Sequence, residues 1–155
     1  MRSHRVRGAF DLAAEARARI EEVSVDRLTA ELAGGDALLV DVREQNEREL
    51  EGVIPGALHA PRGMLEFWVD PTMDIHRPEF QPERRIIVHC AMGGRGALAA
   101  DMLTQMGLGN VASLAGRFAA WKTAGRPIAP ATESPEAPAQ RTSRRLSADP
   151  RATNA

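Results

Sequence analysis

Two short apolar runs restrict the fold of this chain more than any other feature of its sequence. Residues 37–42 (ALLVDV) and 86–89 (IIVH) are almost continuously apolar, which is typical of strands buried on both faces of a parallel sheet. A third apolar run, at residues 111–114, precedes a helical pattern at 118–123. This alternation predicts an α/β fold, in which a central, mostly parallel sheet carries helices on both faces.

The segments around these runs have the spacing and the capping residues of helices. Ser24 can cap a helix that ends at the Gly34-Gly35 pair. Residues 95–106 have apolar side chains at helical spacing, and Gly107 ends that pattern. The other elements that we expect are a helix within residues 1–20, a helix at 44–51, a short strand at 57–60 and a short helix at 64–69.

The chain of 155 residues is long enough for one compact domain with terminal extensions. We predict an N-terminal extension at residues 1–22, the domain at 23–129 and a tail at 130–155. The tail is rich in Pro, Ala, Ser and charged residues, and Leu146 is its only large apolar side chain. Because such a segment buries too little apolar surface to offset its ordering entropy, we expect it to be disordered.

Composition argues against several classes of function. The net charge is −1 and aromatic residues make up 4% of the chain, so nothing indicates a nucleic-acid or membrane-surface partner. No window approaches the roughly 20 apolar residues of a membrane span, and the N-terminus lacks the apolar core of a secretory signal. A single cysteine excludes an internal disulfide, and the scattered histidines lack metal-ligand spacing. We expect a cytoplasmic protein without a metal site.

The single cysteine, Cys90, stands where the second apolar run ends and a glycine-rich turn begins. In open α/β sheets, ligands bind at the carboxyl ends of the strands. Residues 91–94 (AMGG) can curl so that their N–H groups face inward, while the next helix and Arg95 add positive charge. This setting favours a thiolate, the nucleophilic form of cysteine. A lone cysteine is more often buried and inert, so the spacing alone leaves both interpretations open.

Four stretches, in the same order, resemble the rhodaneses, a family of sulfurtransferases. Residues 90–95 (CAMGGR) resemble the Cys-x-x-Gly-x-Arg loop of that family, and 39–44 (LVDVRE) resemble its strand-end Asp-x-Arg motif. Residues 52–57 (GVIPGA) resemble its Gly-His-Ile-Pro-Gly-Ala turn, and 114–127 (LAGRFAAWKTAGRP) resemble its C-terminal motif. The similarity extends from Ser24 to Ile128 and implies the three-layer rhodanese-like fold.

The resemblance also implies a chemistry. The Cys90 thiolate would take the outer sulfur of a donor such as thiosulfate and become a persulfide. It would then pass this sulfur to an acceptor such as cyanide or a thiol, in a two-step covalent exchange that needs neither a metal nor an organic cofactor. The substrate would be held by Ala91, Met92, Gly93, Gly94, Arg95 and Gly96.

Other residues within the resemblance are expected to support the site. Asp41 and Arg43 would hold the scaffold at a strand end, with Arg43 paired to Glu47. Arg62 could reach a substrate anion. We expect His89 to be a buried strand residue rather than a general base, and the large side chains of the short helix at 64–69 and Trp121 to pack in the core.

The sequence departs from the rhodanese pattern at three positions. Gly96 stands where Ser or Thr is common, Val53 replaces the usual His of the Ile-Pro-Gly turn, and Arg117 replaces a glycine. The hydroxyl missing at residue 96 could help to hold a persulfide, so its loss would affect the rate or the choice of donor.

Two alternatives remain open at this stage. A phosphatase or arsenate reductase of the Cys-x5-Arg type would need a loop one residue longer than the four residues that separate Cys90 from Arg95. A regulatory rhodanese-like module would bind a protein without catalysis, although Cys90 is present. A third possibility joins transfer and binding: the domain would deliver sulfur to one protein acceptor, with contacts supplied by the tail from Pro130 onward.

Overall fold

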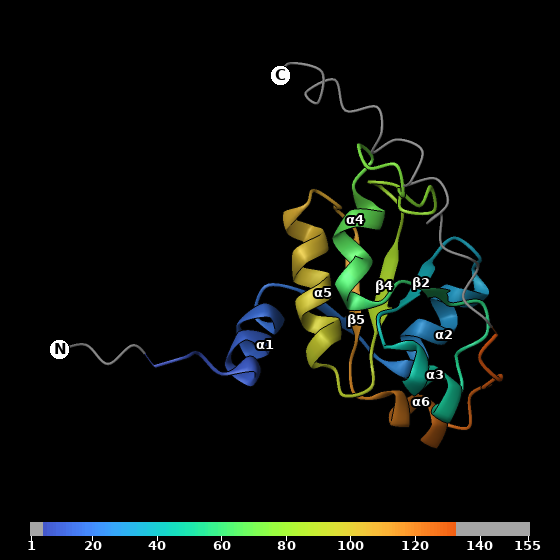
Figure 1. Ribbon diagram of the computed structural model, residues 1–155. Coiled ribbons are helices and arrows are strands. Elements are labelled where there is room, and N and C mark those ends of the chain that lie inside the picture. Colours follow the sequence, from blue (N-terminus) through green and yellow to red (C-terminus); the bar gives the residue numbers. More distant parts are fainter. Residues whose placement is uncertain (1–4, 133–155) are drawn as a thin grey trace, which may run out of the picture.

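The computed structural model describes residues 5–132, which form a five-stranded parallel sheet and the helices around it (Figure 1). The strands are β1 (Glu21–Val23), β2 (Leu38–Asp41), β3 (Leu58–His59), β4 (Ile86–His89) and β5 (Val111–Leu114), in the order β1-β5-β4-β2-β3. The helices are α1 (Ala9–Arg17), α2 (Val25–Ala33), α3 (Gln45–Glu51), α4 (Leu65–Val69), α5 (Gly94–Gln105) and α6 (Phe118–Thr123), with a 3-10 turn at Arg62–Met64. The predicted fold class is confirmed.

Strands β2 and β4 lie side by side in the middle of the sheet, and all of their residues are buried. Their register pairs Leu38 with Ile86 and Asp41 with His89. Burial on both faces explains why the two sequence runs are apolar throughout instead of alternating. Because the two strands end together, Cys90 leaves the sheet beside the end of β2.

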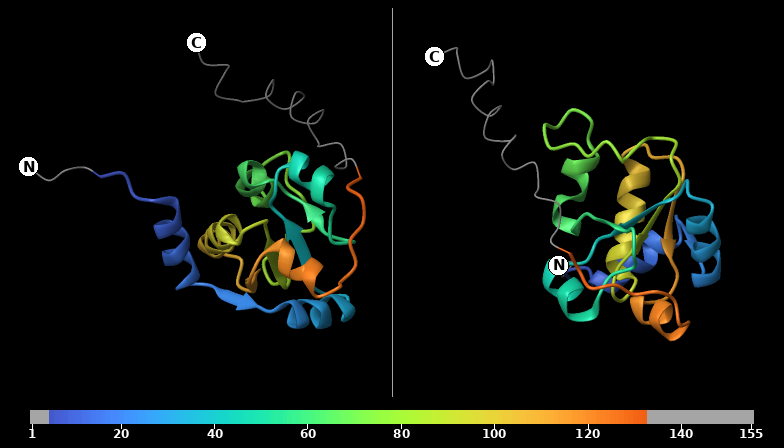
Figure 2. Two further views of the ribbon diagram at one scale, coloured as in Figure 1. Left: turned by 90° about the horizontal axis from the view of Figure 1, so that it is seen from below. Right: turned by 90° about the vertical axis from the view of Figure 1, so that its right-hand side faces the viewer.

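Helices cover both faces of the sheet, which produces three layers (Figure 2). Helices α4 and α5 share one apolar cluster with the sheet, and α2 and α6 share a second cluster on the opposite face. The first cluster includes Val40, Trp68, Val88 and Leu103, and the second includes Leu28, Leu39, Ile87 and Trp121. Trp68 and Trp121 therefore pack in the core, as predicted, whereas Met64 and Phe67 are 38% and 50% exposed.

The edge strand β1 was not expected from the sequence. Two of its three residues, Glu21 and Glu22, are exposed acidic side chains, so the segment has no apolar run. It pairs in parallel with β5, and the Glu21 carboxylate receives two 2.8 Å hydrogen bonds from the guanidinium of Arg85. This strand forms because it pairs with β5, which is distant in the sequence, and no local sequence pattern indicates such pairing.

The helix expected within the first 20 residues is α1, and it packs against α5 (Figure 1). Its contact face is small: Ala13 and Ala16 are 2% and 0% exposed, whereas Phe10 on the outer side is 76% exposed. Arg19, just beyond the helix, adds a two-pronged ion pair with Asp101 of α5, at 3.0 and 2.6 Å. Although this extension precedes the sheet in sequence, it therefore lies on the body of the domain.

The predicted disorder of the tail concerns residues that lie mostly outside the described part of the chain, which ends at residue 132. The predicted domain limits, 23–129, likewise stay a prediction. No helix within residues 5–132 is both long enough and apolar enough to cross a membrane.

Candidate functional site

Residues 90–96, here called the Cys90 loop, join β4 to α5 at the carboxyl edge of the sheet. The Cys90 Sγ accepts hydrogen bonds from the backbone N–H groups of Gly93, at 3.0 Å, and Gly96, at 3.1 Å. Cys90 is 2% exposed, and its sulfur lies at the amino-terminal end of α5. The two amides and the positive end of the helix both favour a negative charge on this sulfur.

Gly93 gives the loop its shape. This residue precedes α5 with a φ of 87°, in the left-handed region that costs little only for glycine. A Cβ at this position would also lie 3.1 Å from Nη2 of Arg17, which belongs to α1. The turn thus directs the Gly93 N–H toward the sulfur, and Arg17 of α1 lies next to Gly93.

Arg95 does not face the sulfur as an unpaired cation. Its Nη1 and Nη2 donate to the two carboxylate oxygens of Glu47, both at 2.6 Å. This hydrogen-bonded pair raises the pKa of Arg95 and lowers that of Glu47. Glu47 also accepts from the backbone N–H of Glu44 at 2.8 Å, so it links the start of α3 to the Cys90 loop.

The predicted Arg43–Glu47 pair is wrong, because Arg43 turns inward to Asp41 instead. Arg43 is 0% exposed, and its Nε and Nη2 donate to the Asp41 carboxylate at 3.0 and 2.9 Å. Burial is the largest single effect and would raise the pKa of Asp41, but the hydrogen bonds and the charge of Arg43, together with the neighbouring His89, hold this pKa below its ordinary value. Arg48 donates to the same carboxylate at 3.2 Å.

Arg43 also fastens neighbouring segments to this edge of the sheet. Its Nη2 donates to the carbonyl oxygen of Gly52 at 2.8 Å, and its guanidinium carbon lies 4.2 Å from the ring centroid of Phe118 in α6. These contacts agree with the scaffold role expected for Asp41 and Arg43, which stays a prediction.

His89 is buried beside this pair and has the surroundings of a neutral imidazole. Burial lowers the pKa of His89 to about 4, against the opposing effect of the Asp41 charge. Its ring stacks on Phe118 at a centroid distance of 6.0 Å. A side chain of this kind is uncharged near neutral pH and fills space in the strand, which fits the structural role expected for it.

The other predicted site residues lie at the same edge. The Ala91 carbonyl oxygen accepts from the N–H of Phe118 at 3.2 Å, and the Met92 side chain is 59% exposed. Arg62 is anchored through its backbone N–H to the Val42 carbonyl at 3.1 Å, while its guanidinium pairs with Glu66. Arg62 thus lies near the site with its charge already paired, and its contact with a substrate stays a prediction.

Ser113 is a neighbour of Gly96 that the sequence motifs did not indicate. It lies in β5, is 3% exposed, and its Oγ occupies the space in front of Gly96. A Cβ at Gly96 would lie 3.1 Å from this hydroxyl and 3.5 Å from the Cys90 Sγ. The absence of a side chain at Gly96 therefore leaves room for the Ser113 hydroxyl. Only the register of β5 in the sheet could have indicated that these two residues lie together.

Gly96→Ser is expected to destabilise the protein. Overpacking against Ser113 costs about 1–3 kcal/mol, which exceeds the roughly 0.5 kcal/mol that serine gains over glycine in a helix. Urea denaturation of the single variant and of Gly96→Ser/Ser113→Ala measures this. The double variant should regain most of the loss, and a single variant as stable as the wild type would mean that the loop relaxes freely.

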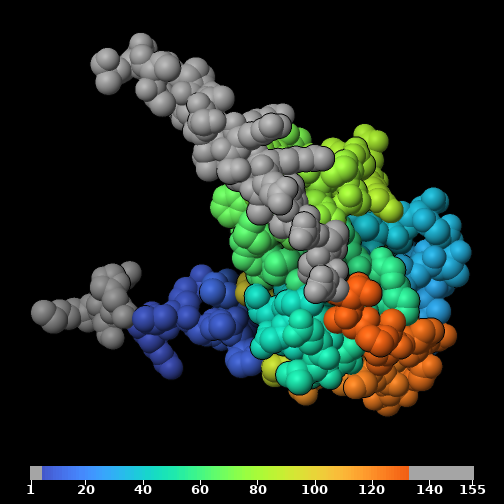
Figure 3. Space-filling view, turned by 45° about the vertical axis from the view of Figure 1, so that its right-hand side comes forward, coloured from blue at the N-terminus to red at the C-terminus, as the bar shows by residue number. Residues whose placement is uncertain are grey.

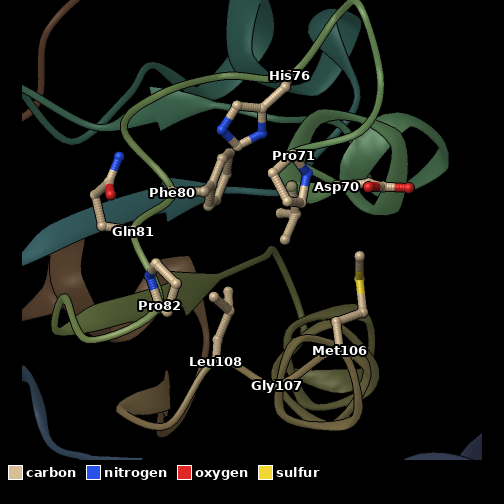
Figure 4. Close-up of a pocket in the computed structure, with 10 residues that line it drawn as sticks. Asp70, Pro71, His76, Phe80, Gln81, Pro82, Met106, Gly107 and Leu108 are labelled. Atoms are coloured by element: carbon tan, nitrogen blue, oxygen red, sulfur yellow. The ribbon is translucent and has the colours of Figure 1, made fainter.

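A hollow lies near the amino-terminal ends of β4 and β5, and Cys90 is not among the residues that line it (Figure 4). It has a volume of about 410 Å³, and its walls include His76, Phe80, Pro82 and Leu108. In α/β sheets the reactive groups gather at the carboxyl ends of strands, so we assign the site to Cys90 and not to this hollow. Within residues 5–132, no group of His, Cys, Asp and Glu side chains is arranged to hold a metal ion.

Comparisons with known proteins agree with the geometry. The sequence model of the rhodanese-like domain family matches residues 24–124 of this chain. The human thiosulfate:glutathione sulfurtransferase is 32% identical over 106 residues, which is 64% of this chain and 90% of that protein. The solved human single-domain sulfurtransferase is 31% identical with a TM-score of 0.56, covering 66% of this chain and 95% of its own.

A solved protein of unknown function from Rhodopseudomonas palustris, described as a possible tyrosine phosphatase, is more similar still. It is 40% identical with a TM-score of 0.76, and the match covers 83% of this chain and 99% of that one. Since the family model spans most of the described residues, the chain belongs to the rhodanese-like domain family.

Proposed function

We propose that this protein is a sulfurtransferase that carries sulfane sulfur as a persulfide on Cys90. The observation on which the proposal rests is the pair of backbone N–H groups, from Gly93 and Gly96, that donate to the Cys90 Sγ. Such donors stabilise a thiolate before reaction and a terminal persulfide anion after it. A cysteine that served only to fill the core would not need them.

The first half-reaction would load the enzyme. The Cys90 thiolate attacks the outer sulfur of thiosulfate, a new sulfur–sulfur bond forms, and the old one breaks as its electron pair leaves with sulfite. In the second half-reaction an acceptor thiolate attacks the outer persulfide sulfur, and the electron pair of the broken bond returns to Cys90. No proton transfer is required in either step, which suits a site whose nearby histidine, His89, is held neutral.

Two features favour sulfur transfer over phosphate-ester hydrolysis, the activity suggested for the Rhodopseudomonas palustris protein. Four residues separate Cys90 from Arg95, and the guanidinium of Arg95 is taken up by Glu47 instead of being free for a phosphate. Hydrolysis of an ester also needs an acid for the leaving oxygen. Two carboxylates at this edge, Asp41 and Glu47, are bound to arginines that lower the pKa of both.

The human relative's name specifies thiosulfate as donor and glutathione as acceptor. We propose the same class of acceptor here, a thiol, with cyanide as a laboratory substitute. A reducing compartment such as the cytoplasm suits this chemistry, because Cys90 must stay a free thiolate between turnovers.

The proposal is tested by the intact mass of the purified protein after incubation with thiosulfate. We expect a gain of one sulfur atom, which cyanide then removes as thiocyanate. Protein whose Cys90 has first been alkylated is the control, and it should gain nothing. If reduced, unblocked protein gains no sulfur from thiosulfate or from a polysulfide, the chain is a non-catalytic member of its family.

A further inference from the structure

An apolar pocket of about 200 Å³ lies against the Cys90 loop, between that loop and α1. The loop and the start of α5 supply one wall, and the extension helix supplies the other. The lining residues are Ala9, Phe10 and Ala13 of α1 and Met92, Gly94, Arg95 and Leu98 of the loop and α5. The same short loop therefore holds the reactive sulfur and forms one wall of an apolar pocket.

Helix α1 is an addition to the part of the chain that carries the family's chemistry. The family model begins at residue 24, whereas α1 spans Ala9–Arg17. The two N–H groups that donate to the Cys90 Sγ belong to Gly93 and Gly96, so α1 supplies neither of them. A helix that docks on α5 and leaves Phe10 76% exposed at the rim of the site needs another explanation than catalysis. Figure 3 shows α1, in blue, standing out from the side of the domain.

The size of the pocket restricts what it can hold. Sites that bury a drug-sized ligand have volumes of about 300–1,000 Å³, so a pocket of about 200 Å³ suits one apolar side chain better than a whole small molecule. The exposed side chains at its rim, Phe10 and Met92, extend the apolar surface beyond the cavity itself. Aromatic residues, methionine and arginine are the types that are enriched where proteins bind proteins.

Charge next to the pocket points to the same kind of partner. The Arg17 guanidinium lies beside Gly93 and makes a loose ion pair with Glu22, at 3.4 Å. With a side chain that is 41% exposed, Arg17 is open to a carboxylate from outside. Helix α1 thus presents an apolar wall and a cation to whatever approaches Cys90.

We infer that α1 and the Cys90 loop dock a protein segment in which the sulfur-accepting cysteine lies close to a large apolar side chain. This inference rests on the proposed function and names its acceptor more closely. The apolar side chain fills the pocket, an acidic residue of the segment faces Arg17, and the cysteine thiolate reaches the outer sulfur on Cys90. That thiolate forms the new sulfur–sulfur bond, and the electron pair of the broken bond returns to Cys90.

The test compares two peptides that differ at one position. Both contain one cysteine and one glutamate, and one has leucine where the other has serine, two residues from the cysteine. Persulfide-loaded wild-type protein should transfer sulfur to the leucine peptide at least about tenfold faster, the discrimination typical of one apolar group in a fitted pocket. Phe10→Ser and Ala9→Asp should remove this preference and leave discharge by cyanide unchanged.

Leu12→Ser is the matched control, because Leu12 lies on the same helix, is 37% exposed and does not line the pocket. It should keep the preference for leucine. Equal rates for the two peptides with wild-type protein would overturn the inference, as would a preference that survives both pocket variants. A wild-type dimer that Phe10→Ser dissociates would also overturn it, because a second copy of the chain would then cover the pocket.

The failure of the proposed function is distinguishable from the failure of this inference. Versions of both peptides with serine in place of cysteine cannot react, and their binding to unloaded protein can be followed by chemical-shift changes in α1 and the Cys90 loop. Absence of loading by both thiosulfate and polysulfide, with selective binding of the leucine version, would reject the catalytic proposal and keep the docking site. Normal loading without selective binding or transfer would keep the catalytic proposal and reject the docking site.

Discussion

Replacing Cys90 with alanine is expected to abolish the transfer of sulfur from thiosulfate to cyanide, leaving only the rate of the reaction in solution. The chain contains no second cysteine that could carry the persulfide, so the whole covalent route is lost. A coupled thiocyanate assay measures the rate, and intact mass should show no added sulfur.

The alanine variant should still fold. It leaves the N–H groups of Gly93 and Gly96 without their acceptor, at a cost of about 1–3 kcal/mol for each, and a typical domain is stabilised by roughly 5–15 kcal/mol. Cys90→Ser is the matched variant, because its hydroxyl oxygen can accept from the same amides. Serine should therefore recover part of the lost stability and none of the transfer. Substantial transfer by either variant would refute the assignment of Cys90.

The central strands could be predicted from the sequence because burial on both faces leaves a local mark. Residues 86–89 and 111–114 were expected as strands and are β4 and β5 within the same limits. The edge strand β1 was missed, because an exposed strand with two glutamates has no such mark and is held by its partner β5. Likewise, the two buried alanines of α1, Ala13 and Ala16, do not by themselves predict that α1 packs against α5.

The site was predictable where it depends on backbone and less so where it depends on pairs of side chains. Two glycines between a strand and a helix predicted a turn whose amides face Cys90, and the N–H groups of Gly93 and Gly96 do so. Which arginine binds which carboxylate could not be decided locally. Arg43 and Arg95 both lie within reach of acidic residues of α3, and only the burial of Arg43 selects Asp41 for it and leaves Glu47 to Arg95.

The position of α1 beside the Cys90 loop depends on tertiary packing. A helix with a low apolar content could have remained a solvated extension. Its docking on α5, helped by the ion pair of Arg19 with Asp101, is what places Phe10 and Arg17 beside the Cys90 loop. The apolar pocket between α1 and the Cys90 loop thus arises from tertiary packing, and no sequence motif predicts it.

Arg43→Leu should lower the free energy of unfolding by about 3–5 kcal/mol, because it leaves the buried Asp41 carboxylate without its main partner. Arg48 retains one hydrogen bond to Asp41, at 3.2 Å, which replaces neither the two-pronged contact nor the bond to the Gly52 carbonyl. Urea denaturation followed by circular dichroism measures the change. Arg62→Leu is the control at the same edge of the sheet: its pair with Glu66 is partly exposed, so its loss should cost no more than about 1 kcal/mol.

The triple variant Asp41→Leu/Arg43→Leu/Arg48→Leu separates the value of the buried ion cluster from the cost of an unpaired charge, because Arg48 donates to the same Asp41 carboxylate. Replacing a buried ion pair by apolar residues is often close to neutral, whereas removing one partner strands the other. The triple variant should therefore be more stable than Arg43→Leu alone, and the single effects should not add. An additive result, or an Arg43→Leu variant as stable as Arg62→Leu, would mean that water reaches Asp41 and that the scaffold around Cys90 is held by packing instead.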